Sequence, residues 1–236
     1  MIRRNLQKMR LILGMMALAI SLAIVTPASA TLTLELSAPS FAPITITDNG
    51  PGDLASGITG MITYQNFSFF GVVNLNVDVG LSKPQVGNVV TPILDLNAVL
   101  STSGPITLTL RLSDTDFSGN GSAPFVGSIG GTLNSTGGSN VAYSAYLDLS
   151  NTLFGHGTPL CSMTGLTGPA FSNTCSTNAA LGSAYSVTLE TVLTMGAGFT
   201  SFDAAIADAP EPTSMILLGL GLVGFAAWKR RQLAVN

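Results

Sequence analysis

The sequence predicts an all-β fold: an antiparallel, jelly-roll-like β-sandwich ectodomain, preceded by an N-terminal signal helix and followed by a single C-terminal transmembrane helix. Two observations predict this arrangement. Apolar and polar residues alternate over many short segments in the middle of the chain, and both chain ends carry an apolar run next to basic residues. Alternation with a period of two is typical of strands with one buried face. Apolar runs beside cations are typical of targeting segments.

Residues 1–30 have the three parts of a secretory signal peptide. Basic residues up to Arg10 are followed by an apolar run at residues 11–25, and the segment ends with the small residues Ala28-Ser29-Ala30. This order, with an A-x-A site at its end, is typical of a signal that is removed during export. We expect cleavage after Ala30, which makes Thr31 the first residue of the mature protein.

Residues 31–207 are expected to form a β-rich extracellular domain. Gly, Asn, Ser and Pro separate the clearest alternating segments, which are residues 32–36, 75–79, 94–98, 106–112, 141–149 and 185–189. This spacing predicts about nine or ten strands and no helix. Antiparallel sheets with one solvated face produce such a pattern, which favours a sandwich or a jelly roll. A β-solenoid is the alternative, although the sequence has no fixed repeat period.

Positive charge is concentrated in the two chain ends. Between residues 31 and 209 only Lys83 and Arg111 are basic, against eleven acidic residues, which gives this stretch a net charge of −9. Binding to nucleic acid requires a basic surface, so the composition excludes that class of function. Lysine commonly protects the edge strands of sheets. Its scarcity here predicts self-association through strand edges as one mode of assembly.

Two cysteines and one histidine are the residues with the most reactive side chains. Cys161 and Cys175 flank a segment rich in Gly, Ser, Thr and Pro that we expect to be a loop, and export to an oxidising compartment predicts a disulfide between them. His156 lies between two glycines, as in an exposed loop tip, and no G-x-S-x-G nucleophile motif accompanies it. We therefore expect no catalytic residues and no enzymatic activity.

A calcium loop is the one cofactor site that the sequence suggests. Asp114, Asp116 and Ser118 alternate before Gly119, which is how oxygen ligands curl around a hard cation. The twelfth position is Phe125, where a calcium loop needs a bidentate glutamate. The other interpretation is a polar turn after the strand at residues 106–112, and no other cofactor is expected.

Residues 208–236 form the second targeting segment. Pro210-Glu211-Pro212 precedes an apolar segment at residues 215–228, and Lys229-Arg230-Arg231 follows it. At about 1.5 Å per residue that segment is shorter than a typical bilayer core of about 30 Å. The terminal tryptophan and the basic cluster nevertheless favour a transmembrane helix at residues 213–228 with its basic end in the cytoplasm. A G-x-G-x-x-G match at residues 219–224 follows no predicted strand, so it does not indicate nucleotide binding.

Pro-Glu-Pro, a short Leu/Gly-rich span and a terminal Arg cluster together resemble the PEP-CTERM sorting tail of Gram-negative-type bacteria. The resemblance covers only residues 210–236. It implies that a membrane-embedded exosortase recognises the tail, cuts near Pro210, Glu211 and Pro212, and passes the protein outward. The predicted partners are accordingly the exosortase, the export machinery and the membrane.

The main functional prediction is a non-catalytic protein of the cell surface or of an extracellular matrix such as a biofilm. Exopolysaccharide and further copies of the chain are its expected partners there. The alternative is a carbohydrate-binding or adhesive module, with or without calcium. Two further classes are an ice-binding protein, suggested by Thr-x-Thr pairs at residues 31/33, 45/47 and 107/109, and a secreted hydrolase. The uneven spacing of the threonine pairs argues against a regular ice-binding array.

Overall fold

The computed structural model of the chain describes residues 32–209, 219–222 and 225. The predicted signal cleavage site at Ala28, Ala30 and Thr31, the sorting residues 210–212 and the basic residues 229–231 lie outside these ranges. Within them, no helix has the length and hydropathy that crossing a bilayer requires. Residues 32–209 are folded into strands, as the alternation predicts.

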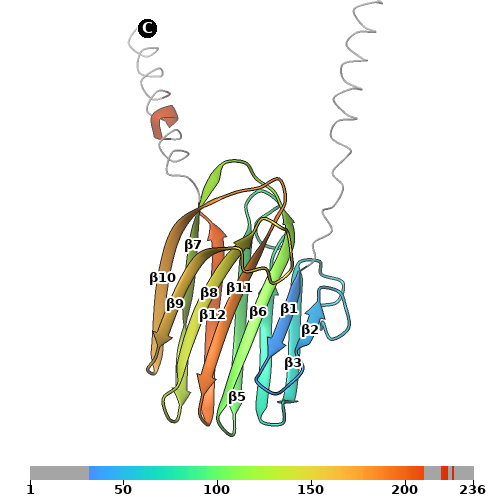
Figure 1. Cartoon of the computed structure of the whole chain (residues 1–236), viewed down its shortest axis with the longest axis vertical. Coiled ribbons are helices and arrows are strands. Elements are labelled where there is room, and N and C mark those ends of the chain that lie inside the picture. The colour runs from blue at the N-terminus through green and yellow to red at the C-terminus, as the bar shows by residue number, and fades with distance from the viewer. Residues whose placement is uncertain (1–31, 210–218, 223–224, 226–236) are drawn as a thin grey trace, which may run out of the picture.

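Twelve strands form two antiparallel sheets of six strands each, packed face to face (Figure 1). Sheet A has the order β2-β1-β6-β11-β8-β9, and sheet B has the order β10-β7-β12-β5-β4-β3. The strands are β1 (Thr33–Ser37), β2 (Ile44–Thr47), β3 (Met61–Phe69), β4 (Val73–Leu81), β5 (Ile93–Thr102), β6 (Ile106–Phe117), β7 (Ser122–Ser135), β8 (Asn140–Asp148), β9 (Thr158–Leu166), β10 (Ala170–Ala180), β11 (Tyr185–Met195) and β12 (Gly198–Asp208).

Strands β5 to β12 have the connectivity of a jelly roll. Four antiparallel pairs, β5 with β12, β6 with β11, β7 with β10 and β8 with β9, make one long ribbon that is folded over into two sheets. Strands β1 and β2 extend sheet A, and β3 and β4 extend sheet B. The prediction of an antiparallel sandwich is confirmed.

The number of strands and two of their boundaries differ from the sequence prediction. The stretch between the cysteines is not a loop, because β9 and β10 run through it and leave only residues 167–169 between them. The strand expected at residues 106–112 continues to Phe117, so the predicted turn begins later. Strand β9 pairs with β8, β10 pairs with β7, and β6 pairs with β11. Pairing with these neighbours stabilises strand structure in residues whose own sequence pattern does not predict it.

The core lies between the sheets and is built from the inward-facing residue of each alternating pair. Leu, Ile and Val side chains fill most of it, and its largest buried rings include Tyr143, Tyr185, Phe117, Phe125 and Phe202. Outward-facing positions are mostly Ser, Thr, Asn and Asp. The in/out alternation of the sequence therefore reports correctly which face of each strand is buried.

All strands alternate in direction, which places β1's start and β12's end at the same end of the sandwich. Figure 1 shows the start of β1 and the end of β12 at the same end of the sandwich. We call it the terminal end; it carries the loops at residues 48–60, 82–92, 118–121, 149–157 and 181–184. The opposite end, the far end, carries the shorter connections.

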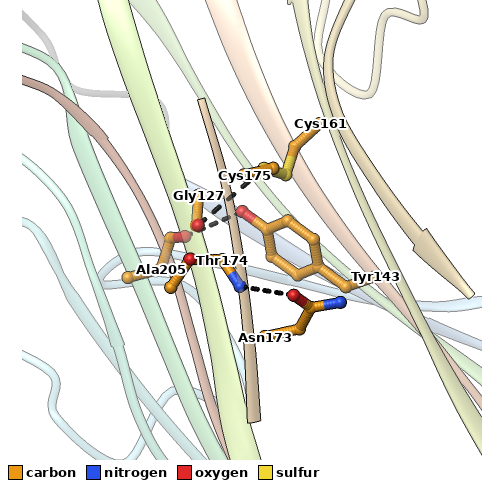
Figure 2. The surroundings of a disulfide bond; sticks show 7 residues. All are labelled: Gly127, Tyr143, Cys161, Asn173, Thr174, Cys175 and Ala205. Carbon is orange, nitrogen blue, oxygen red and sulfur yellow. Dashed lines mark hydrogen bonds between the residues drawn. A yellow bond between two sulfur atoms is a disulfide. The ribbon is translucent and has the colours of Figure 1, made fainter. Parts of the chain in front are cut away.

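The predicted disulfide between Cys161 and Cys175 is confirmed, with a Cα–Cα distance of 6.0 Å. It joins β9 at the edge of sheet A to β10 at the edge of sheet B, so it closes one side of the sandwich (Figure 2). Gly127 of β7 passes beneath it, and a Cβ atom there would lie 2.7 and 2.8 Å from the two sulfur atoms. The neighbouring Tyr143 hydroxyl donates a hydrogen bond to the carbonyl of Ala205 across the sandwich at 2.7 Å.

Candidate functional site

The residues of the predicted calcium loop have other partners. Asp114 is fully buried on β6, and its Oδ2 lies 2.8 Å from the ammonium of Lys83 and 2.6 Å from the hydroxyl of Ser82, which donates to it. The Lys83 ammonium also lies 3.7 Å from the centre of the Phe117 ring. The carboxylate that would start the calcium loop is therefore neutralised by the domain's one lysine, which holds residues 82–92 against β6.

Asp116 and Ser118 do not face Asp114. Asp116 accepts a hydrogen bond at 2.8 Å from the side-chain amide of Asn151, while the Ser118 N–H donates to the carbonyl of Val89 at 2.8 Å. Within residues 32–209 and the short tail segments that the structure describes, no group of three His, Cys, Asp or Glu side chains is placed to hold a metal ion. The calcium prediction has no assembled ligand set in this part of the chain.

A row of charges crosses the outer face of sheet A. Arg111 of β6 is bonded on one side to Glu35 of β1 at 3.0 Å and on the other to Glu190 of β11 at 2.6 Å. His156 stacks on the ring of Tyr146 with 4.2 Å between ring centres, and its Nε2 lies 3.5 Å from Glu190. The single histidine thus packs against sheet A and joins this charge row.

The loop at residues 149–157 folds over the rest of that face. The Phe154 N–H donates to the hydroxyl of Ser113 at 3.0 Å, and the Ser186 hydroxyl donates to the carbonyl of Thr152 at 2.6 Å. Ser113 and Ser186 point outward from the sheet yet are fully buried. Sheet A therefore presents little open surface near the terminal end.

The threonine pairs do not form one array. Thr33 of β1 lies opposite Thr47 of β2, whereas Thr107 of β6 lies opposite Thr194 of β11. The row of Glu35, Arg111 and Glu190 crosses sheet A between the two sets. A flat face of regularly spaced threonines, the pattern behind the ice-binding alternative, is absent from the described strands.

The outer face of sheet B is open and contains a depression of about 300 Å³. Strands β3, β4, β5 and β12 line it with Phe67, Asn74, Leu75, Asn76, Val99, Leu100, Ser101 and Phe199. Phe67 and Phe199 are 73% and 46% exposed. They flank the depression, because β3 and β12 lie on either side of β4 and β5. With strands about 4.8 Å apart, the two rings are roughly 14 Å from each other across the sheet.

A β-bulge next to Phe67 turns Phe69 into the core. The pairing of β3 with β4 shifts between Asn66 and Phe69, so that β3 has one residue more than its partner there. Phe69 turns into the core while Phe67 stays on the outer face. Bulges often redirect side chains next to binding sites in this way.

The floor between the two rings is mainly apolar, with a few polar groups from β4 and β5. Asn74 of β4 lies opposite Ser101 of β5, and its amide donates to the Ser101 hydroxyl at 3.4 Å. Ser101 in turn lies opposite Phe199 of β12, and Asn76 lies opposite Val99. Leu75 and Leu100 point into the core and contribute backbone. The depression is therefore a mainly apolar surface with two aromatic rings and a few amide and hydroxyl groups, which can donate and accept hydrogen bonds.

A pair of carboxylates lies further along the same face, toward the terminal end. Asp95 of β5 and Asp203 of β12 are diagonal neighbours, since Asp95 lies opposite Ala205 and Asp203 lies opposite Asn97. Burial, the charge of Asp203 and a contact between the two side chains together raise the pKa of Asp95 to about 6, with burial as the largest cause. Asp95 is therefore protonated more readily than an ordinary aspartate in mildly acidic solution.

The C-terminal segment of the chain matches a known sorting signal. Residues 208–231 match the PEP-CTERM protein-sorting motif. The chain carries a PEP-CTERM sorting signal. The resemblance inferred from Pro-Glu-Pro, the apolar span and the basic cluster is confirmed, and the signal marks an exported protein with a membrane-anchored sorting tail.

The PEP-CTERM motif begins inside the folded sandwich. Its first residue, Asp208, is the last residue of β12 and lies opposite Phe125. The Asp208 N–H donates to the carbonyl of Pro92 at 3.0 Å, and the Ala209 N–H donates to the carbonyl of Pro124 at 2.8 Å. No linker separates the sandwich from the sorting signal.

No curated protein sequence matches the chain. Among solved structures, the active domain of tailspike protein 4 from bacteriophage CBA120 aligns at 13% identity and a TM-score of 0.33, over 60% of this chain, which spans 20% of that one. A carbohydrate-binding module of the β-sandwich superfamily aligns at 13% identity and a TM-score of 0.33, over 77% of this chain and 74% of the module. A mannan-recognising carbohydrate-binding module aligns at 11% identity and a TM-score of 0.27, over 56% of this chain and 80% of the module. Likenesses this weak carry no argument about the ligand of the PEP-CTERM protein.

Sequence reasoning missed the depression on sheet B. Its residues are far apart in the chain, from Phe67 to Phe199, and only the pairing of β3, β4, β5 and β12 brings them together. One signal was present: Phe199 occupies an outward position of an alternating strand, where a polar residue is expected. The bulge next to Phe67 has no comparable signal in the sequence.

Proposed function

We propose that this PEP-CTERM protein is a non-catalytic component of the cell surface or extracellular matrix that binds polysaccharide in the depression on the outer face of sheet B. One observation carries the proposal: two exposed phenyl rings flank a mainly apolar floor that carries a few amide and hydroxyl groups. The C–H groups of a pyranose ring pack against aromatic faces, and its hydroxyls pair with groups that donate and accept. Small-ligand sites have this combination of apolar lining and few polar groups.

The dimensions of the depression favour a chain of sugars. Phe67 and Phe199 are separated by β4 and β5, so one sugar ring cannot stack on both phenyl rings, whereas an oligosaccharide lying across the strands can. The row of Asn74 and Ser101 between them would pair with the intervening hydroxyls. Polysaccharide is thus the ligand class that uses every group lining the site.

The carboxylate pair supports binding without hydrolysis. A glycosidase needs two carboxyl groups about 5 to 9.5 Å apart, so that a sugar or a water fits between them. Asp95 and Asp203 are instead diagonal neighbours on adjacent strands, close enough for their side chains to interact directly, so a sugar does not fit between them. They also lie beyond the lining of the depression.

Binding is tested with the protein that cells release, by a glycan array followed by titration of the strongest ligand. Phe67→Ala and Phe199→Ala are each expected to weaken binding by about 5- to 30-fold, which corresponds to about 1–2 kcal/mol of lost apolar burial. Val126→Ala is the matched control, because Val126 is exposed on the same sheet and lies outside the depression. Absence of any saturable glycan, or equal effects of all three changes, would refute the site.

We further propose that an exosortase processes the tail near Pro210, Glu211 and Pro212. Prolines fix the backbone and disfavour helix for the residue before them, so this segment suits extended recognition by an enzyme. The intact mass of the released protein tests the step, compared with a variant in which residues 210–212 are alanine. Release with residues 215–228 still attached, or release of the variant with the same mass, would contradict it.

A further inference from the structure

The short connection between the sandwich and the sorting tail limits which end of the domain can lie near the membrane. The backbone of Asp208 and Ala209 is hydrogen-bonded to the carbonyls of Pro92 and Pro124, so the folded domain extends to residue 209. Five residues lie between Ala209 and Met215, where the apolar segment begins. Fully extended, they reach about 20 Å at most. Strand β12 alone, with 11 residues, is roughly 37 Å long.

The tether is therefore shorter than the sandwich. While the tail is anchored, the terminal end has to lie near the bilayer surface. The far end cannot take its place, because it lies about one strand length further from the anchor. The loops of the terminal end are the part of the domain that meets the membrane.

Those loops expose large apolar side chains. Leu54 and Ile58 lie in the loop at residues 48–60, Val90 in the loop at residues 82–92 and Leu149 in the loop at residues 149–157. Their exposed fractions range from 46% to 64%. Single exposed apolar residues are common on protein surfaces, but here three separate loops present them at the end where the tail leaves. We call these four residues the apolar rim.

We propose that the apolar rim rests in the interfacial layer of the bilayer while the tail is anchored, and that this contact holds the sandwich upright. The inference depends on the proposed membrane anchoring of the tail. Apolar side chains at the level of the lipid headgroups gain free energy by leaving water. The rim loops also carry Asp48 and Asp53, so apolar burial and not attraction to anionic lipid drives the contact.

An upright domain presents the glycan site away from the membrane. Phe199 precedes Asp208 by nine residues on β12, which places it roughly 30 Å from the anchored end. Phe67 also lies toward the far end, near the turn that joins β3 to β4. The orientation leaves the depression open to polysaccharide before the tail is cut.

Single-tryptophan variants of the full chain in vesicles test the contact. Trp228→Phe removes the chain's one tryptophan, and Val90→Trp or Leu149→Trp then places the reporter in one of two rim loops. Phe67→Trp is the matched control at the far end. In brominated phosphatidylcholine vesicles the two rim reporters are expected to lose most of their emission, while the control keeps it.

Flotation of the same vesicles separates the two proposals. If the chain floats and neither rim reporter is quenched, the rim contact is overturned and anchoring stands. Equal quenching of rim and control reporters means that the sandwich lies flat, which overturns the upright orientation. A chain that fails to float overturns the anchoring itself, and with it the contact. Circular dichroism with a β-sheet spectrum confirms for each variant that the sandwich is folded.

Discussion

Replacing Lys83 with methionine tests the most deeply buried ion pair of the sandwich. The ammonium lies 2.8 Å from the Asp114 carboxylate, and both side chains are almost fully enclosed. At an effective dielectric constant of about 20 their attraction is about 6 kcal/mol, and the cost of desolvation offsets a large part of it. Lys83→Met keeps the volume but leaves the carboxylate unpaired, so the free energy of unfolding is expected to fall by about 3–5 kcal/mol.

Urea unfolding of the released protein measures this loss, and a double variant attributes it to the pair. Lys83→Met combined with Asp114→Asn removes the unpaired charge, so it is expected to be more stable than Lys83→Met alone by about 1–3 kcal/mol. Arg111→Met is the control, because Arg111 is the other cation of the domain and its side chain is 30% exposed. Its loss is expected to cost about 1 kcal/mol. A cost for Lys83→Met no greater than the control, or strictly additive costs in the double variant, would refute the reasoning.

Two further predictions concern the disulfide between Cys161 and Cys175 and the pair of Asp95 and Asp203. Cys161→Ser removes the crosslink to Cys175, 14 residues away in the chain, and is expected to lower the free energy of unfolding by about 3 kcal/mol. In Gly127→Ala the added Cβ would contact both sulfur atoms and the Tyr143 hydroxyl, so this change is expected to destabilise the oxidised protein more than the reduced one, as thermal melts with and without reductant would show. The folded-state pKa of Asp95 is raised to about 6, above its value in the unfolded chain, so stability is expected to increase as pH falls from 7 toward 4, by about 1 kcal/mol after discounting for solvent screening. Asp203→Asn should flatten this dependence in urea titrations, and an unchanged slope would contradict the coupling.

Much of the fold was predictable because its periodicity is local. Residues 106–112 and 141–149 alternate strictly, and the structure buries the apolar face of each except at Leu149, which follows the end of β8 and is exposed. The two cysteines were paired correctly from the oxidising compartment alone. Strands β9 and β10 were missed because their Gly, Ser and Thr residues favour turns, and only pairing with long neighbours makes them strands.

The candidate site was less predictable for a physical reason. A binding surface on a sheet is made by residues that the strand order places side by side, and strand order is not encoded locally. Asn74, Ser101 and Phe199 come from three strands, and the bulge beside Phe67 adds a shift of register. The same holds for Lys83 and Asp114, which are 31 residues apart in the chain.

The sequence by itself determined the C-terminal sorting signal of this protein and the class of its fold. Targeting signals are read as short linear segments, so charge, hydropathy and Pro-Glu-Pro suffice to define them. The alternation of apolar and polar residues is enough to predict an antiparallel sandwich, because each strand has one solvated and one buried face. Only the tertiary structure decided where the surface is hollowed, which aromatic rings are presented and which loops share the end with the sorting tail. Those properties depend on contacts between residues distant in the chain, which the fold creates and no local pattern records.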